Sequence, residues 1–285
     1  MTGTATATSA WWSTAKSRTR AVCRPAKKSP AGLAPVRNLS PAQRRSLRAA
    51  DVVVAGNAWP APLPIACIES SVDAGTYDAW YHTPRGTWIG ETEFQLLRRL
   101  LRPERGESLL DVGCGTGYFT TRFAGETGLH VVGLDPNASW LDFARAHGNG
   151  TERYCLGTAE SLPFADRSFD FGVSVTALCF VDDARRAVRE ILRITRKRFA
   201  IGLLNRHSLL YLQKGRAGGS GAYRGAHWHA TQEIRALFDG LPAANLKVRS
   251  AVFLASGGPI ARGIERLISH RLSLGAFVVV AGDVR

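Results

Sequence analysis

The sequence predicts an α/β fold in which helices cover a mostly parallel β-sheet. Three observations support this prediction. Short apolar runs alternate with segments of helical periodicity, a glycine-rich turn follows the first run, and acids end the first two runs, at Asp111 and Asp135. Parallel strands bring their carboxyl ends to one edge of a sheet, so we expect the turn and the acids to form a ligand site at that edge.

The first strand and its turn lie within residues 109–120, Leu-Leu-Asp-Val-Gly-Cys-Gly-Thr-Gly-Tyr-Phe-Thr. Gly113, Gly115 and Gly117 stand at alternate positions, and a helix-like segment follows from Tyr118. Glycine allows backbone angles closed to other residues and leaves room for a ligand against the backbone, next to the free N–H groups of a helix start. The spacing is G-x-G-x-G and not the G-x-G-x-x-G of dinucleotide-binding proteins.

A second buried strand, residues 130–135, ends in Asp135, 24 residues beyond Asp111. An acid at this strand end can accept hydrogen bonds from both ribose hydroxyls of an adenosine-bearing ligand. Residues 154–170 then predict a third strand, a loop and the approach to a fourth strand over 171–175.

Together these segments resemble the class I S-adenosylmethionine-dependent methyltransferases. The acid and glycine turn resemble their motif I, and the pattern G-x-A-E-x-L-P-F…S-F-D within 154–170 is similar to the ubiquinone/menaquinone-methyltransferase-like family, methyltransferase type 11. The resemblance is good over residues 77–195. It implies a Rossmann-like, seven-stranded, mostly parallel sheet with an antiparallel last strand, helices on both faces, and S-adenosyl-L-methionine as cofactor. Residues 196–199, Arg-Lys-Arg-Phe, replace the Pro-Gly-Gly turn usual in that family.

The resemblance also implies which residues bind the cofactor. They are Asp111, Gly113, Cys114, Gly115, Thr116, Gly117, Asp135, Pro136, Ala159 and Glu160. Asp111 would order the turn or meet the amino end of the cofactor through water. The glycine turn would hold the amino-acid portion, and Asp135 would hold the ribose. Ala159 and Glu160 would flank the adenine, while Thr158 stands where relatives often carry an acid.

We expect methyl transfer to a small or medium-sized acceptor. The sulfonium already makes the methyl group electrophilic, so the protein must mainly align two reactants and exclude water. No catalytic residue and no acceptor atom can be assigned. Residues 171–181 lack the N-P-P-Y or D-P-P-Y segment of base-amine methylation and the Pro-Cys of cytosine C5 chemistry. A non-catalytic adenosylmethionine-binding module is one alternative, and a nucleotide-cofactor oxidoreductase, which the glycine spacing disfavours, is another.

Aromatic residues gather ahead of the glycine turn, at Tyr77, Trp80, Tyr81 and Trp88. In the resembled family this segment covers the cofactor and helps form the acceptor pocket, which makes these residues candidates for a lid. Aromatic side chains at helical spacing equally fit plain packing, and both interpretations stay open.

Two histidines, His227 and His229, alternate around Trp228. They suggest a general base or a metal pair, but two histidines without a third ligand make a weak metal site, and loop histidines are usually structural or solvated. We therefore assign no metal.

Periodicity predicts the remaining elements. Helices are expected over 91–101, 139–147 and 182–195, and strands over 199–204, 245–254 and 275–280, the last two as a hairpin-like pair. A further helix is expected to be capped by Thr231, with Glu233 in its first turn.

The basic charge of the chain is concentrated at one end. Residues 1–50 hold ten Lys or Arg and no acid, whereas the rest of the chain holds 27 Lys or Arg against 23 Asp or Glu. We expect residues 1–70 to be a disordered basic extension, with a transit peptide or an over-extended gene start as alternatives, and residues 71–285 to form the methyltransferase domain. This distribution gives no clear nucleic-acid site on the domain.

The five cysteines are scattered, with no C-x-x-C pair, which is typical of a reducing compartment, and we expect a cytoplasmic protein. Cys179 is expected to be packed and not nucleophilic. No apolar run approaches the roughly 20 residues that span a bilayer. The sequence does not indicate an oligomeric state.

Overall fold

The computed structural model describes residues 73–285. The predicted basic extension, residues 1–70, lies outside the described residues. Among residues 73–285, no helix has the length and apolar character that crossing a membrane requires.

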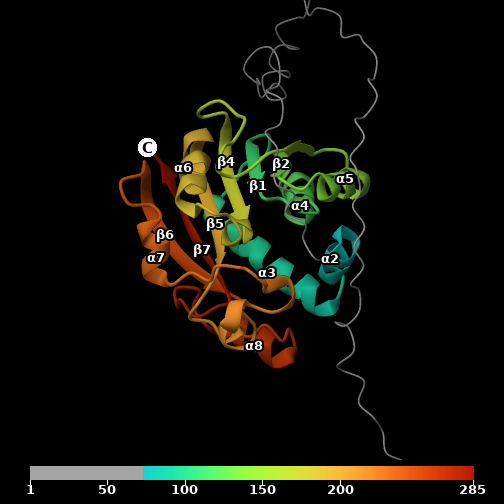
Figure 1. Ribbon diagram of the computed structural model, residues 1–285, viewed down its shortest axis with the longest axis vertical. Coiled ribbons are helices and arrows are strands. Elements are labelled where there is room, and N and C mark those ends of the chain that lie inside the picture. Colours follow the sequence, from blue (N-terminus) through green and yellow to red (C-terminus); the bar gives the residue numbers. More distant parts are fainter. Residues whose placement is uncertain (1–72) are drawn as a thin grey trace, which may run out of the picture. The chain divides into compact units, whose positions relative to one another are not determined.

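Seven strands form one sheet in the order β3-β2-β1-β4-β5-β7-β6 (Figure 1). Neighbouring strands are parallel except at β7, which runs antiparallel to both β5 and β6. The strands are β1 (Ser108–Val112), β2 (His130–Asp135), β3 (Arg153–Leu156), β4 (Phe169–Val175), β5 (Thr195–Leu204), β6 (Ala243–Ala251) and β7 (Phe277–Val284). The predicted sheet with its antiparallel last strand is confirmed.

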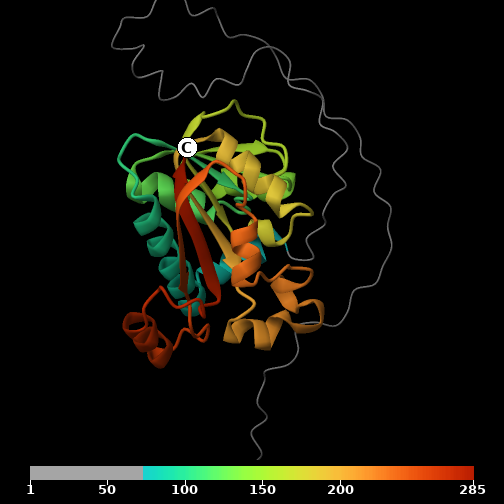
Figure 2. The same ribbon diagram turned by 90° about the vertical axis from the view of Figure 1, so that its left-hand side faces the viewer.

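Helices cover both faces of the sheet (Figure 2). The helices are α2 (Ala74–Tyr81), α3 (Pro84–Leu101), α4 (Tyr118–Thr127), α5 (Ala138–His147), α6 (Ala184–Ile194), α7 (Thr231–Ala236) and α8 (Pro259–Leu267). Four short turns follow β4 and β5: η1 (Ala177–Cys179), η2 (Tyr211–Gly215), η3 (Arg216–Gly218) and η4 (Gly221–Tyr223). The helices predicted over 139–147 and 182–195 correspond to α5 and α6.

The core lies where α3 and α4 meet the central strands. All five residues of β1 are buried, as expected for a strand with helices on both sides. Phe94 of α3 and Phe123 of α4 are fully buried with ring centroids 5.0 Å apart. Burying each ring contributes roughly 1.5–3 kcal/mol, so this contact ties α3 to α4.

Helix α3 begins seven residues earlier than the predicted helix over 91–101. Pro84 does not break the segment but occupies the first helical turn, where its missing N–H is not needed. Thr83 caps the helix by accepting the N–H of Gly86 at 3.0 Å. A Cβ at Gly86 would lie 1.9 Å from the carbonyl oxygen of Trp80, so glycine allows α2 and α3 to approach closely.

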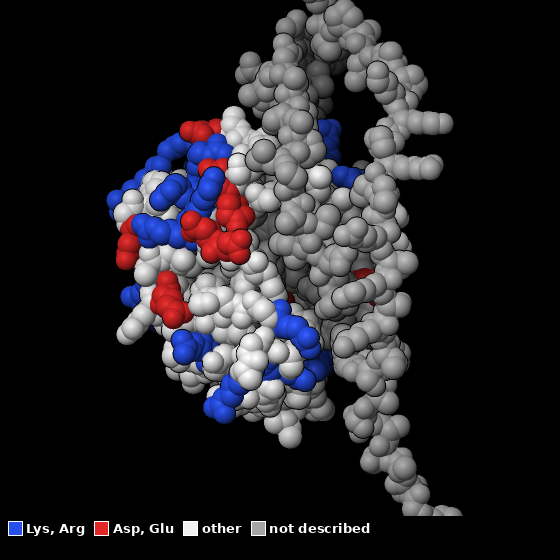
Figure 3. Space-filling view, in the orientation of Figure 1, with Lys and Arg blue, Asp and Glu red and all other residues white. Residues whose placement is uncertain are grey.

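Strand β5 starts directly after α6, without the turn that the resembled family carries. Its first residue, Thr195, bonds back to the carbonyl of Ile191 through its hydroxyl at 2.6 Å. The basic run that follows is ion-paired: Arg196 with Asp170, Lys197 with Glu107 and Arg198 with Asp283. Basic and acidic side chains are likewise interleaved on the visible face in Figure 3. These charged side chains therefore have a structural role at the amino end of β5.

The predicted cap of α7 is wrong in detail. Thr231 is the first helical residue and Ala230 precedes it as the cap position. The Glu233 carboxylate performs the capping instead, because its Oε2 accepts the N–H of Ala230 at 2.9 Å. The acid in the first turn thus binds the N–H of the cap residue, and no hydroxyl caps the helix.

The two late β segments pair as predicted, as β6 and β7. They are not joined by a tight turn, since α8 lies between them. β7 also pairs with β5, which explains why its first six residues are all buried.

Candidate active site

Backbone hydrogen bonds tie the glycine turn to the end of β2. The N–H groups of Gly113 and Cys114 both donate to the carbonyl of Leu134, at 2.7 and 3.0 Å. The N–H of Gly115 donates to Oδ2 of Asp135 at 2.9 Å. The carboxyl ends of β1 and β2 are thereby fixed side by side at one edge of the sheet.

Two polar atoms of this segment have no hydrogen-bond partner among the described residues, Oδ1 of Asp111 and Oγ1 of Thr116. Asp111 is 1% exposed, and its other oxygen accepts the hydroxyl of Thr120 at 2.7 Å. Asp111 therefore bonds to helix α4 and not to the backbone of the turn. An unpaired buried polar atom costs about 1–3 kcal/mol, so this arrangement suits a polar ligand that supplies the missing partners.

The ionisation of Asp111 is tuned by its surroundings. Burial raises the pKa of Asp111 to about 7, the hydrogen bond from Thr120 opposes the rise, and the charge of Asp135 adds to it. A cationic ligand group at the open oxygen would favour the ionised form.

Asp135 already has a structural role. Its Oδ1 accepts the N–H of Asn137 at 2.8 Å, so each carboxylate oxygen receives one backbone N–H. Burial raises the pKa of Asp135, and the two N–H groups oppose that rise. A carboxylate has about four acceptor positions, so two stay open for further donors. Asp135, the residue predicted to bind the ribose, therefore also holds the backbone of the glycine turn and of Asn137, the residue after Pro136.

The third loop starts beside the same acid. The N–H of Gly157 donates to the carbonyl of Asp135 at 3.2 Å, and Thr158 pairs back to Ser161 in an isolated bridge. Ala159, in this loop, is buried. The fold thus brings the loop of Ala159 and Glu160 to the edge that carries the glycine turn, and their contact with adenine stays a prediction.

All three glycines of the turn face other side chains, with Gly117 against the hydroxyl of Tyr154. Gly113 has φ +76°, and a Cβ there would lie 2.1 Å from the Cβ of Ala177 in η1. Gly115 has φ +57°, and its Cβ would lie 3.3 Å from the ring of Trp140. Gly113 is therefore required for close packing as well as for its backbone angle, which the motif alone does not indicate.

Residues 110–199, from β1 into β5, match a family described as "Methyltransferase domain". This segment is a methyltransferase domain. The match covers the glycine turn, both strand-end acids and the third loop, which are the parts on which the sequence prediction rested.

Relatives of this methyltransferase domain share only part of their length with the chain. Malonyl-[acyl-carrier protein] O-methyltransferase of Pectobacterium atrosepticum is 37% identical over 123 residues, which are 43% of this chain and 46% of that protein. An uncharacterised methyltransferase of Mycobacterium bovis is 41% identical over 104 residues, 36% of this chain and 42% of that protein. The chain spans about half the length of the curated relatives that it matches.

A solved structure resembles more of the chain. A S-adenosylmethionine-dependent methyltransferase from Thermotoga maritima, described as a possible histamine N-methyltransferase, has a TM-score of 0.60 and 28% identity over 74% of this chain and 95% of its own. The predicted class of S-adenosylmethionine-dependent methyltransferases is confirmed, and with it the cofactor class. The ubiquinone- and menaquinone-methyltransferase-like grouping stays a prediction.

The aromatic segment ahead of the methyltransferase motif packs over its helices. The ring of Tyr81 stacks on Tyr118 of α4, with centroids 3.9 Å apart, and the ring of Tyr77 lies 4.8 Å from Trp140 of α5. Tyr81 is buried, whereas Trp80 and Trp88 are half-buried. Because Trp140 also faces Gly115, the segment reaches the glycine turn, which is compatible with both the packing and the lid interpretation.

A half-buried carboxyl that the sequence analysis did not single out, Glu93 of α3, lies near this aromatic cluster. Burial raises the pKa of Glu93 to about 8, and its charge in turn helps to raise the pKa of Tyr77, Tyr81 and Tyr223. Glu93 lies on a helix of mixed polarity, and α2 packs against that helix. No local pattern could have indicated it.

Glu93→Gln is expected to stabilise the protein at pH 8 by roughly 2 kcal/mol and to leave its stability at pH 4 nearly unchanged. The folded carboxyl holds its proton up to about pH 8 and the unfolded one loses it near pH 4.5. Between these values folding takes up a proton, so the free energy of unfolding falls as pH rises, and glutamine removes this fall. Urea unfolding of both proteins between pH 4 and pH 9 measures the difference.

Glu91→Gln on the same helix is the matched control. Partial burial acts to raise the pKa of Glu91, but hydrogen bonds from Gln95 and Arg122 outweigh it and hold the pKa below its ordinary value. This variant should lose stability near neutral pH and none at low pH. A Glu93→Gln profile parallel to that of the unsubstituted protein would contradict the assignment.

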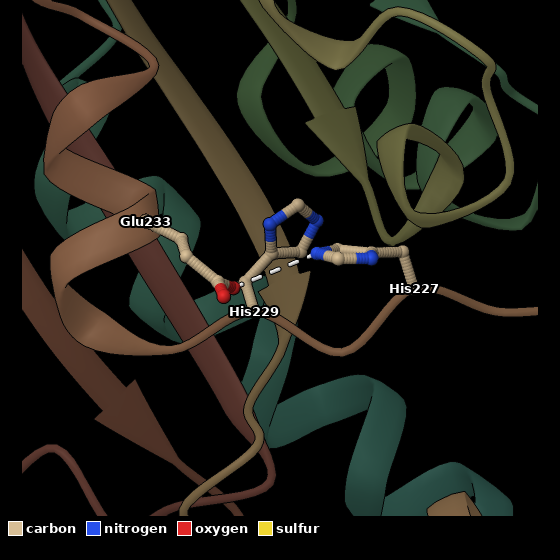
Figure 4. A group of neighbouring side chains, drawn as sticks. All are labelled: His227, His229 and Glu233. Carbon is tan, nitrogen blue, oxygen red and sulfur yellow. Dashed lines mark ion pairs between the residues drawn. The ribbon is translucent and has the colours of Figure 1, made fainter.

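His227 and His229 lie at the carboxyl ends of β4 and β5, and the structure adds a third polar group beside them. Their ring centroids are 4.4 Å apart, and the Glu233 carboxylate lies 3.5 Å from Nε2 of His227 (Figure 4). Burial lowers the pKa of His229 to about 4, so its imidazole is neutral near pH 7. Glu233 could be expected here only from its position four residues beyond His229 at a helix start.

Cys179 is packed, as predicted. It is buried, and its sulfur accepts the N–H of Leu204 at 3.2 Å. Burial raises the pKa of the Cys179 thiol to about 12, which keeps it protonated and unreactive.

Proposed function

We propose that this protein transfers a methyl group from S-adenosylmethionine to a small or medium-sized acceptor. The observation that carries the proposal is the motif I turn of the methyltransferase domain, where Oδ1 of Asp111 and Oγ1 of Thr116 are buried without partners in the described part of the chain. A free carboxylate oxygen and a hydroxyl fit the ammonium and carboxylate of an amino-acid group.

The chain's own residues would bind and orient the cofactor. Asp111 and Thr116 would hold its amino-acid end, and the two open acceptor positions of Asp135 would hold the ribose hydroxyls. Ala159 and Glu160 would flank the adenine from the third loop. Bound S-adenosylmethionine supplies a methyl group that its sulfonium makes electrophilic.

The acceptor would lie at the same edge of the sheet, beyond the ends of β4 and β5. The aromatic cluster of α2 and α4 would exclude water there. The Pectobacterium relative is named an O-methyltransferase, and the Thermotoga structure a possible N-methyltransferase. Together they favour an acceptor with an oxygen or nitrogen nucleophile. A cytoplasmic location is part of the proposal, on the strength of the scattered cysteines.

The test is to titrate the protein with S-adenosylhomocysteine by calorimetry and then to assay S-adenosylmethionine with a panel of small carboxylic acids, phenols and amines. Formation of S-adenosylhomocysteine that depends on an acceptor supports the proposal. Tight binding without turnover across the panel would instead indicate a non-catalytic binding module. Binding of a nicotinamide dinucleotide but not of S-adenosylhomocysteine would indicate an oxidoreductase.

A further inference from the structure

We propose that His227, His229 and Glu233 form a binding site for a divalent transition-metal ion of the Zn²⁺ class. The three side chains each offer one ligand atom, and these atoms all lie within 4.8 Å of one another. Figure 4 shows the two rings and the carboxylate converging from the segment ahead of α7 and from its first turn. Imidazole nitrogen and carboxylate oxygen are the ligands that Zn²⁺ takes most often beside cysteine sulfur.

The backbone holds this segment in place. The N–H of His227 donates to the carbonyl of Cys179 at 2.7 Å, and that of His229 to the carbonyl of Leu204 at 2.9 Å. Trp228 is buried against Tyr211 and Tyr223. Because side chains alternate along extended chain, the burial of Trp228 puts the two histidines together on the other side.

One ring nitrogen of the proposed site lacks a hydrogen-bond partner among the described residues. Nε2 of His229 is buried and has no hydrogen-bond partner among residues 73–285, although the residue is only 3% exposed. A buried imidazole nitrogen without a partner is costly, and a metal ion would supply what the protein does not. This observation is independent of the clustering of the three groups.

The remaining contacts leave room for coordination. Oε2 of Glu233 accepts the N–H of Ala230 at 2.9 Å, and Oε1 lies 3.7 Å from Nη1 of Arg206. Tetrahedral Zn²⁺ ligands stand about 3.3 Å apart at bonds of about 2.0–2.2 Å, so the cluster must contract on binding. The His227 side chain, 61% exposed, can move inward, while His229 and the capping Glu233 hold their positions.

Three protein ligands leave a coordination position open, which is typical of catalytic rather than structural Zn²⁺ sites. The short turn η1 joins this site to the glycine turn, since Ala177 packs on Gly113 and Cys179 binds the backbone of His227. If the proposed function holds, the open position would bind an oxygen or nitrogen of the acceptor and lower its pKa. The metal site itself does not depend on that function.

The experiment titrates the full-length protein, freed of metal with a chelator, with Zn²⁺ in competition with a chromophoric chelator. We expect one ion per chain. His229→Ala and His227→Ala should each weaken binding by more than the roughly 10–100-fold that changes in a metal's outer shell cost. Glu233→Gln should weaken it too, because it removes the charge but keeps an oxygen for the cap. The matched control is His130→Ala, since His130 is an exposed residue at the start of β2, on the opposite edge of the sheet.

Unchanged Zn²⁺ affinity in His227→Ala would overturn the proposal, as would wild-type protein that binds no stoichiometric ion. His227 is exposed, so its variant is informative even if His229→Ala fails to fold, which the melting temperature reports. Binding of S-adenosylhomocysteine is measured separately on the same metal-free protein. Loss of that binding would count against the proposed function and not against the metal site.

Discussion

Asp135→Ala is expected to weaken S-adenosylmethionine binding by about 10²–10³-fold and to lower the free energy of unfolding by about 3 kcal/mol. The carboxylate accepts the N–H groups of Gly115 and Asn137 in the folded protein and, in our proposal, two ribose hydroxyls in the complex. Hydrogen bonds to a charged group contribute about 1.5–3 kcal/mol each, and roughly 1.4 kcal/mol is tenfold in affinity. Calorimetric titration and urea unfolding measure the two effects.

Asp135→Asn should lose nearly as much stability as the alanine variant. Each carboxylate oxygen faces a backbone N–H, so an amide group in either orientation points its NH₂ at one of these donors. The sequence alone suggests a milder effect, because an amide keeps one acceptor oxygen for the ribose. Because both oxygens of Asp135 bind backbone N–H groups, the one acceptor oxygen of asparagine does not preserve stability.

Asp170→Ala provides the matched control. Asp170 also accepts a backbone N–H and a hydroxyl, both from Ser108, but it lies at the amino end of β4, on the opposite edge of the sheet. This variant should lose stability and keep its affinity for the cofactor. A folded Asp135→Ala protein whose cofactor affinity is within a few-fold of the unsubstituted value would rule out the ribose contact.

Much of the fold could be predicted because its strands are buried and their ends are chemically marked. β1 and β2 are apolar runs with an acid at or next to their ends, and the parallel register pairs Asp111 with Gly133, so that Asp135 lies two residues further along the neighbouring strand. The α3 helix was predicted too short because Pro84 and Gly86 look like breakers locally. Their actual roles, a helix start and a close helix contact, depend on the neighbouring Trp80 carbonyl, which the sequence does not place.

Some residues of the candidate site could likewise be predicted from the sequence, and others could not. The glycine turn and Asp135 could be found because a motif marks them. Glu93 could not, because the burial that raises the pKa of its carboxyl is marked by no local pattern. Glu233 stands only four residues beyond His229, but it meets the two histidines only once α7 has formed. The sequence also does not indicate that each oxygen of Asp135 already accepts one backbone N–H.

The turn η1 connects the parts of the site that the sequence leaves separate. It follows β4, and its first and last residues, Ala177 and Cys179, contact the glycine turn and the histidine segment respectively. Thr176, which precedes it, has φ +58°, a left-handed angle that is unusual outside glycine. A change that pushes η1 away from the glycine turn should therefore disturb the cofactor and histidine sites together.

Gly113→Ala makes that change with a single methyl group. The variant should lose about 2–5 kcal/mol of stability, since it combines a left-handed angle, which costs roughly 1–2 kcal/mol, with overpacking, which costs roughly 1–3 kcal/mol. The added Cβ would lie 2.1 Å from the Cβ of Ala177.

Gly106→Ala is the control, because Gly106 has φ +86° and a Cβ there would meet nothing within 4 Å. This variant should lose only the stability that the left-handed angle costs. Adding Ala177→Gly to Gly113→Ala should restore the packing part and, with it, cofactor affinity. Equal losses in the Gly113 and Gly106 variants by urea unfolding would show that the contact with η1 contributes nothing.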